Sequence, residues 1–414
     1  MTAFDPKIGR RSILKSMAAA GALSMWDAPA RFAFAAVPTD RRLVVVILRG
    51  ALDGLAAVPP HGDKDYQSVR GALAMPVNGT GAVHDLDGFF GLHPALTNMK
   101  GLYDAKELVV FHNICSPYRD RSHFDGQNVL ESGGTSPHLL QDGWLNRALA
   151  PMGMATGDHA LAIAQSPPLM LMGPGQTTSW MPAVMPAPNE VFLNQVRALY
   201  ASDAVLRQSL DSALNLQAQA ESAMDDPSSQ GMMGRPGKGG AYGDLTPLFQ
   251  GAGKLLAAPG GPRVATLEAS GWDTHVAEGT ADGQLGRRLQ ALDAAIDAMR
   301  TAMGPEVWKK TAVVMATEFG RTVHPNGSGG TDHGTGGAAF LFGGAVAGGR
   351  VEAEWVGLNP ANLKDGRDQP ARTDLRSLFK GVLAEQMGVA QASLNGTVFP
   401  DSGSVQPLKG LIRV

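Results

Sequence analysis

The chain has 414 residues, of which 44% are hydrophobic, and a formal net charge of −3. This length is enough to bury a large core, as one domain or two. The small net charge gives no reason to expect nucleic acid as a partner. A single cysteine, Cys115, excludes an intramolecular disulfide framework.

The first 36 residues are typical of an export signal rather than of a folded domain. Arg10-Arg11, within Gly9–Lys15, resembles the twin-arginine motif. The apolar stretch Met17–Trp26 is too short to span a bilayer, and Ala33-Phe34-Ala35 offers a cleavage site. We expect a periplasmic or secreted protein without a stable membrane span, carried by the twin-arginine export machinery. The alternative is a chance arginine pair before a short core helix.

Short apolar runs along the mature chain predict buried strands. They are Leu43–Leu48, Leu108–Phe111, Arg263–Leu267, Ala312–Ala316 and Ala338–Phe342. Helical patterns separate them, at Ser122–Glu131, Asn189–Met224 and Gln284–Met303. This alternation predicts a single α/β domain over residues 37–414, with a mainly parallel central sheet and helices on both faces.

One segment of the mature chain, residues 225–244, interrupts this alternation. It is rich in glycine and proline, which predicts a flexible insertion. Its composition favours a disordered loop over a lid that covers a site.

Carboxylates and histidines follow several of the expected strands, at the sheet edge where open α/β sheets bind ligands. Each of them alone is also explained as a cap or a turn residue. Together they predict a metal site for one or two ions. Mixed histidine and carboxylate ligands suit Zn²⁺ or Mn²⁺, whereas an all-oxygen subset would favour Ca²⁺ or Mg²⁺. The candidate ligands are Asp53, Asp273, His275, Glu318, Asp332 and His333.

Ser122 opens a predicted helix and is the candidate nucleophile. With Asp125 three residues later, it also fits an ordinary helix start of the capping-box type. In the functional interpretation, its hydroxyl lies beside the free backbone N–H groups of the helix, which stabilise an anion. Arg121 or Arg321 would then hold the oxygens of a phosphate or sulfate ester.

These segments resemble the bacterial domain-of-unknown-function 1501 family, a twin-arginine-exported branch of the alkaline phosphatase/sulfatase superfamily. The resemblance covers nearly the whole mature chain. The motifs that carry it are RGALDGL (Arg49–Leu55), LDGFFGLHPAL (Leu86–Leu96), SPYRDRSHFDGQ (Ser116–Gln127), GWLNRAL (Gly143–Leu149), GWDTH (Gly271–His275), TEFGRT (Thr317–Thr322) and GGTDHG (Gly329–Gly334).

The superfamily resemblance implies an alkaline-phosphatase-like fold and two groups of metal ligands. Asp273, His275 and His333 look like the first group, while Asp53, Glu318 and Ser122 resemble parts of the second. Three departures from the superfamily pattern are present, one in the first group and two in the second. Asp273 and His275 are closer together than is usual, Asp53 lies beyond its strand end, and Phe319 stands where a histidine would. The second metal would lack a ligand unless His123 or Asp332 replaces it.

A second candidate nucleophile is Cys115, because Cys115–Arg119 matches the C-x-P-x-R pattern of sulfatases. The alternative is a buried structural cysteine after a strand. We expect an exported metal-dependent hydrolase of a small anionic ester, with a phosphate mono- or diester preferred over a sulfate. The rival hypotheses are a sulfatase that uses Cys115 and a non-catalytic periplasmic protein that binds a metal or ligand.

Overall fold

A nine-stranded sheet forms the centre of the computed structural model, in the order β10-β4-β9-β8-β1-β7-β5-β6, with β11 also paired to β4. The structure describes residues 39–182, 190–224 and 245–413. The expected export signal and the expected insertion at 225–244 lie outside the described residues. The strands are β1 (Arg42–Arg49), β4 (Leu108–Cys115), β5 (Ala160–Ile163), β6 (Thr178–Trp180), β7 (Val264–Ser270), β8 (Thr311–Thr317), β9 (Gly337–Phe342), β10 (Arg350–Ala353) and β11 (Thr373–Asp374). A separate two-stranded sheet pairs β2 (His84–Asp85) with β3 (Gly91–Leu92).

The central strand β1 shows why its sequence is apolar throughout. Successive side chains of a strand point to opposite faces of the sheet. Val44, Val46 and Leu48 therefore enter one core, and Leu43, Val45 and Ile47 enter the other. Both faces are covered, as the continuous apolar run predicts.

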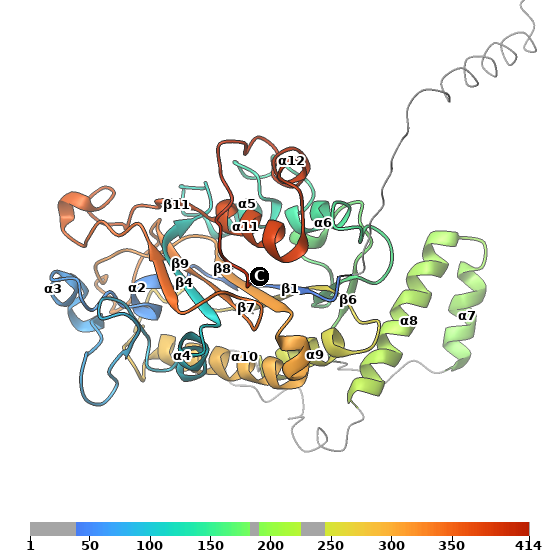
Figure 1. The fold of residues 1–414 in the computed structure, drawn as a ribbon, viewed down its shortest axis with the longest axis horizontal. Helices are drawn as coiled ribbons and strands as arrows, with labels where there is room; N and C mark the ends of the chain where they lie inside the picture. The colour runs from blue at the N-terminus through green and yellow to red at the C-terminus, as the bar shows by residue number, and fades with distance from the viewer. Residues whose placement is uncertain (1–38, 183–189, 225–244, 414) are drawn as a thin grey trace, which may run out of the picture. The chain divides into compact units, whose positions relative to one another are not determined.

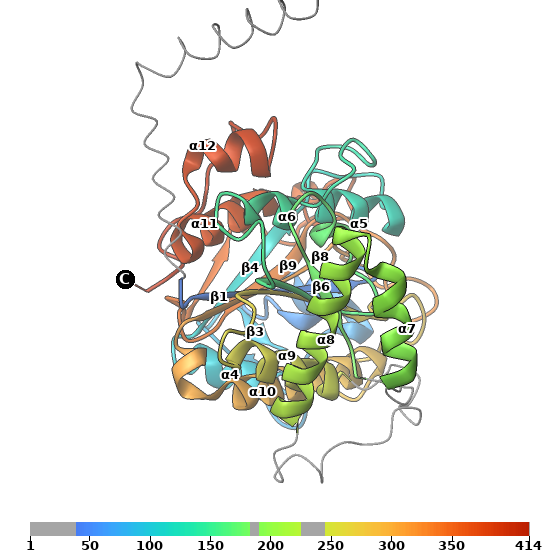
Figure 2. The same cartoon turned by 90° about the vertical axis from the view of Figure 1, so that its right-hand side faces the viewer.

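Helices cover both faces of this sheet (Figure 1). On one side lie α4 (Thr97–Asp104), α9 (Thr246–Ala257) and α10 (Gln284–Trp308). On the other lie α5 (His123–Ser132), α6 (Trp144–Leu149) and α11 (Leu375–Met387). The view turned by 90° shows the same two layers (Figure 2). The predicted α/β architecture with a mainly parallel sheet is confirmed.

The remaining helices are short or peripheral. A pair, α7 (Glu190–Tyr200) and α8 (Ala204–Met224), lies where the sequence predicts long surface helices. The short helices are α2 (Gly54–Ala57), α3 (Tyr66–Arg70) and α12 (Gln391–Ser393). The residues that the structure describes belong to one compact unit. No helix within the described ranges is long and apolar enough to cross a membrane.

Strand β9 is the exception to the parallel sheet, because it runs antiparallel to both of its neighbours, β4 and β8. It starts at the edge where β8 ends, so the loop from Glu318 to Gly336 leaves and re-enters the sheet on one side. The carboxyl ends of β1, β4 and β7 lie at the same edge, because these strands are parallel to β8 within the sheet. This edge carries the site.

Candidate metal centre

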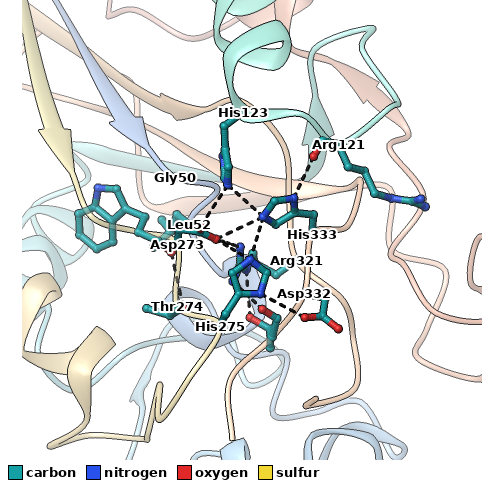
Figure 3. Close-up of polar contacts among 12 residues, drawn as sticks. Gly50, Leu52, Arg121, His123, Asp273, Thr274, His275, Arg321, Asp332 and His333 are labelled. Atoms are coloured by element: carbon teal, nitrogen blue, oxygen red, sulfur yellow. Dashed lines mark hydrogen bonds and ion pairs between the residues drawn. The ribbon is translucent and has the colours of Figure 1, made fainter. Parts of the chain in front are cut away.

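Four side chains converge at this edge (Figure 3). His123 begins α5 after β4, Asp273 and His275 follow β7, and His333 lies in the loop between β8 and β9. The Nε2 atom of His333 is 3.0 Å from Nε2 of His123 and 3.0 Å from Nε2 of His275. The Asp273 carboxylate lies 3.0 Å from His275 Nε2 and 3.4 Å from His123 Nε2. Ligand atoms of a tetrahedral zinc ion lie about 3.3 Å apart, so these spacings are of the size that one ion requires. One ligand atom from each of His123, Asp273 and His333 lies within 4.8 Å of the others, and His275 adjoins this group.

The hydrogen bonds of the three Nδ1 atoms determine whether each Nε2 atom carries a proton or a lone pair. Nδ1 of His333 faces the backbone carbonyl of Arg121 at 2.9 Å, so this nitrogen must carry the proton. Nδ1 of His123 faces Glu318 at 2.8 Å, and Nδ1 of His275 faces Asp332 at 3.1 Å. In the neutral rings all three Nε2 atoms therefore direct lone pairs into one small space. That arrangement is repulsive alone and suits a cation, and such outer partners are typical of metal-binding histidines.

The charge balance points to a divalent ion. Asp273, Glu318 and Asp332 contribute −3 and Arg321 contributes +1, which leaves −2 while the histidines are neutral. The pKa of each of these carboxyls lies below its usual value. For Asp273, burial opposes ionisation but Arg321, His123 and His275 outweigh it. For Glu318, burial is outweighed by hydrogen bonds from His123 and Gln127. For Asp332, the hydrogen bond from Asn326 is the largest cause.

His123 and His333 differ in basicity. The hydrogen bond to Glu318 raises the pKa of His123, whereas burial lowers the pKa of His333. A proton on His123 is therefore the natural competitor of a metal ion, because metal binding requires the neutral imidazole.

Local backbone and packing features fix these side chains. Arg121 has a left-handed backbone with φ of 61°, which is costly for a residue other than glycine and which accompanies the contact of its carbonyl with His333. Phe319 stacks on the ring of His123 with centroids 5.0 Å apart. Phe319 packs directly against Gly126 of α5, where a Cβ atom would lie 3.0 Å from the phenyl ring. Phe319 therefore orients His123 by packing, in the position where the superfamily comparison implied a ligand.

Asp53 lies outside this cluster. Its carboxylate caps α2 through the N–H groups of Leu55 and Ala56 and pairs at 2.7 Å with Arg70, and both side chains are buried. Arg70 also faces Glu278 at 3.8 Å. Two carboxyl groups share one buried guanidinium, so one of them keeps its proton. Burial and the charge of Asp53 raise the pKa of Glu278 to about 8, which identifies Glu278 as the protonated partner.

Glu278 also connects the two loops that carry the cluster. It accepts hydrogen bonds of 2.9 Å from the hydroxyls of Thr274 and Thr331. Thr274 lies between Asp273 and His275, and Thr331 precedes Asp332 and His333. A single buried side chain thus positions both ligand-bearing segments.

The two candidate nucleophiles have different surroundings. Ser122 is the N-cap residue of α5, yet its side chain makes no capping hydrogen bond, which leaves the simple capping interpretation without support. Its backbone N–H donates to the hydroxyl of Tyr118 at 3.2 Å. Cys115 is buried, and burial raises the pKa of its thiol to about 11.

The two candidate arginines are already engaged. Arg321 is buried, donates to Asp273 at 2.6 Å and holds the hydroxyl and carbonyl of Thr331. Arg121 pairs with Asp368, and its guanidinium points away from the histidines (Figure 3).

The structure thus gathers Asp273, His275 and His333 at one point, with Glu318 and Asp332 as their partners in a surrounding shell. It also places His123 within the cluster, although the sequence suggests this residue only as a substitute ligand. The signal was present, since His123 directly follows the serine that opens a helix at a strand end, but the capping pattern offered a simpler explanation for that segment.

The chain matches one protein-family model. A family model described as "Protein of unknown function (DUF1501)" matches residues 112–399, a span that contains all four converging residues. No curated protein sequence matches the chain.

Two solved structures show a distant likeness. One is the C-terminal periplasmic domain of EcEptC from Escherichia coli in complex with Zn, at 10% identity and a TM-score of 0.34, covering 73% of this chain and 72% of that one. The other is Ps i-CgsB in complex with k-i-k-neocarrahexaose, at 12% identity and a TM-score of 0.35, covering 89% and 77%. Likeness at this level does not assign a function to the chain.

Proposed function

This chain belongs to the DUF1501 family, and from the geometry of its metal centre we propose that it is a metal-dependent hydrolase of an anionic ester, with a phosphate mono- or diester preferred over a sulfate. The observation that carries the proposal is the convergence of three imidazole lone pairs and one carboxylate. Asp273, His123, His275 and His333 would hold one ion, with Zn²⁺ or Mn²⁺ preferred over Ca²⁺ or Mg²⁺. A second ion is not needed by this set, since Arg70 neutralises Asp53.

Each polar group around the centre has a definable task. A divalent ion in such a site polarises an ester oxygen and lowers the pKa of a nearby hydroxyl or water. Ser122 is the proposed nucleophile. It precedes His123 in the chain, and its hydroxyl lies at the start of α5 without making a capping hydrogen bond. Arg321 places a buried positive charge against Asp273 and offsets negative charge that develops beside it.

The test combines metal analysis with a hydrolysis screen. Protein loaded with Zn²⁺ or Mn²⁺ should bind about one equivalent and hydrolyse an aryl phosphate, a phosphodiester or an aryl sulfate. Ser122→Ala should lower kcat by about 10³-fold or more while metal content and folding are retained. Activity that survives this substitution would assign the nucleophile to water. Metal-loaded protein without turnover on any of the three substrates would refute the hydrolase proposal.

A sulfatase that uses Cys115 is a weaker alternative. A buried thiol with a raised pKa is a poor nucleophile, and its Sγ atom faces the carbonyl of Glu318 at 3.7 Å rather than the cluster. An intact mass that includes an unmodified cysteine would exclude conversion to formylglycine.

A non-catalytic metal-binding protein is the other alternative. It is favoured by the pairing of Arg121 with Asp368 and of Arg321 with Asp273, which leaves fewer free cations for a substrate. The hydrolysis screen separates this alternative from the enzyme, because both would bind the metal.

We also propose that the protein is exported to the periplasm or beyond by the twin-arginine machinery. This rests on the resemblance of Gly9–Lys15 to that signal. Cell fractionation tests it: a variant in which both Arg10 and Arg11 are replaced by lysine should stay in the cytoplasm, and its export would contradict the proposal.

A further inference from the structure

A second group of charged residues lies beside the metal centre and is not used by the proposed chemistry. Arg121 and Arg367 both pair with the fully buried carboxylate of Asp368. Arg121 Nη2 lies 2.5 Å from one of its oxygens, and Arg367 Nε lies 3.1 Å from the other. One buried carboxylate therefore holds two guanidinium groups in fixed positions.

Both arginines also contact His333, the residue at the middle of the cluster. The carbonyl of Arg121 accepts from the His333 ring, and Arg367 Nη2 donates to the His333 carbonyl at 2.6 Å. The guanidinium of Arg367 thus contacts the backbone of a cluster residue, and the guanidinium of Arg121 extends away from the histidines to the same Asp368. Both groups lie beside the metal centre, where they can bind a neighbouring group on the same molecule rather than the group that contacts the metal.

Backbone pairing makes this arrangement rigid. Val323 N–H donates to the carbonyl of Arg367 at 2.9 Å, and Thr322 pairs with Asp368 on one side and with the Asp332 carbonyl on the other. The segment of Arg367 is therefore joined through Thr322–Val323 to the ligand loop itself. A pre-organised pair of arginines loses little entropy when it binds an oxyanion.

The charge and exposure of the group suit an anion. Arg121, Arg367 and Lys364 contribute +3, and Asp365 and Asp368 contribute −2, which leaves +1 in a protein whose total charge is negative. The two arginine side chains are 25% and 41% exposed. Within the described residues, the hydrogen bonds of both guanidinium groups use Nε or Nη2, and neither Nη1 atom makes one. Those nitrogens are available to a phosphate or sulfate oxygen.

We propose that Arg121 and Arg367 form a second anion subsite, so that the preferred substrate carries a second phosphate- or sulfate-type group near the ester bound at the metal centre. This inference rests on the proposed function for the identity of the first group. It reassigns Arg121 from the reacting ester, as the sequence suggested, to a neighbouring anion.

The experiment measures affinity with compounds that cannot be hydrolysed. Alkane bisphosphonates with three to five carbons are compared with the matching alkylphosphonates by calorimetry on Zn²⁺-loaded protein. The wild type should prefer the best bisphosphonate by about 10-fold or more, as a second charge-assisted contact of about 1.4 kcal/mol or more implies. Arg367→Gln and Arg121→Gln should each reduce that preference to about twofold. The latter keeps the backbone carbonyl that orients His333.

The matched control is Arg300→Gln, which removes an exposed arginine of α10 that pairs with Asp297 and should keep the full preference. Zinc content and thermal unfolding of each variant show that the site and fold are intact. An equal affinity of wild type for both probes, or a preference that survives in both variants, overturns the inference. A bisphosphonate preference without ester hydrolysis would refute only the proposed function, whereas hydrolysis of simple monoesters without the preference would refute only the subsite.

Discussion

At the scale of single residues, Glu278 has the most unusual environment near the site. It is completely buried, it shares Arg70 with Asp53, and it receives two threonine hydroxyls from the loops that carry the cluster. Its other oxygen, Oε1, lies 3.8 Å from Nη2 of Arg70. The protonated acid thus holds the network neutral.

This protonation predicts a pH dependence of stability. The pKa of Glu278 is about 8 in the folded protein and 4.5 in its ordinary state, so the folded protein holds one extra proton between these values. The contribution of Glu278 to stability is therefore present below about pH 4.5 and is lost as the pH rises toward 8. The glutamine of Glu278→Gln cannot titrate. Between pH 5 and pH 8, the free energy of unfolding should therefore fall by at least about 1 kcal/mol more in the wild type than in this variant. Chemical unfolding at both pH values measures this.

The exposed Glu306→Gln, on the far end of α10, is the control and should follow the wild type. Parallel curves for wild type and Glu278→Gln would show that Glu278 is ionised in the folded protein, in contradiction to the charge balance proposed for the buried pair.

At the scale of elements, the loop between β8 and β9 depends on a close backbone approach. A Cβ atom at Gly330 would lie 2.3 Å from the Thr274 carbonyl oxygen and 2.4 Å from the carbonyl carbon of His275. No side chain can move aside there, because the obstructing atoms are backbone. The glycine lets the two ligand-bearing segments lie in contact.

Gly330→Ala should therefore separate these segments and weaken metal binding about 10-fold or more, with a loss of about 1–3 kcal/mol in stability. Gly327→Ala is the matched control. Gly327 lies in the same loop, and a Cβ atom there would meet nothing within 4 Å. Titration of Zn²⁺ against a chromophoric chelator measures the affinity. Equal affinities for the two variants would show that the close approach does not position the ligands.

The elements also show what sequence can and cannot predict here. Continuous apolar runs marked β1, β8 and β9, because strands covered on both faces have no polar side to interrupt the pattern. The sequence does not predict that β9 is antiparallel, because an apolar run is the same for a parallel and for an antiparallel strand. Asp53 was assigned to a metal from its position after β1, but its partner Arg70 comes from an ordinary short helix and has no sequence signal. Whether a carboxylate such as Asp53 binds a metal or pairs with an arginine depends on the side chains that tertiary packing brings next to it.

At the scale of the whole molecule, the four converging residues come from three segments that are far apart in the chain. An ion bound there would stabilise only the folded state, because the unfolded chain does not gather these ligands. Removal of the metal with EDTA should lower the Tm, and an excess of Zn²⁺ at about 100 times its Kd should restore about 2.7 kcal/mol.

Two variants make this prediction specific. His333→Ala removes the central ligand and should abolish the response of the Tm to Zn²⁺. His61→Ala removes a histidine that pairs with Asp85, outside the cluster, and should keep the response. An unchanged Tm in the wild type after confirmed metal removal would argue against a metal bound by the folded cluster.

The separation of His123 from His333 has a consequence for biosynthesis. During translation, the last ligand is made only after 210 further residues, when β1, β4, β7 and β8 have already been synthesised. Metal capture is therefore a late event, which requires these strands to occupy their correct order in the sheet. An intermediate with one strand misplaced would present two or three ligands and bind the ion weakly. Proteins that use the twin-arginine route, which is the proposed export path here, generally travel folded. Loading with metal would thus distinguish finished molecules from incomplete ones before transport.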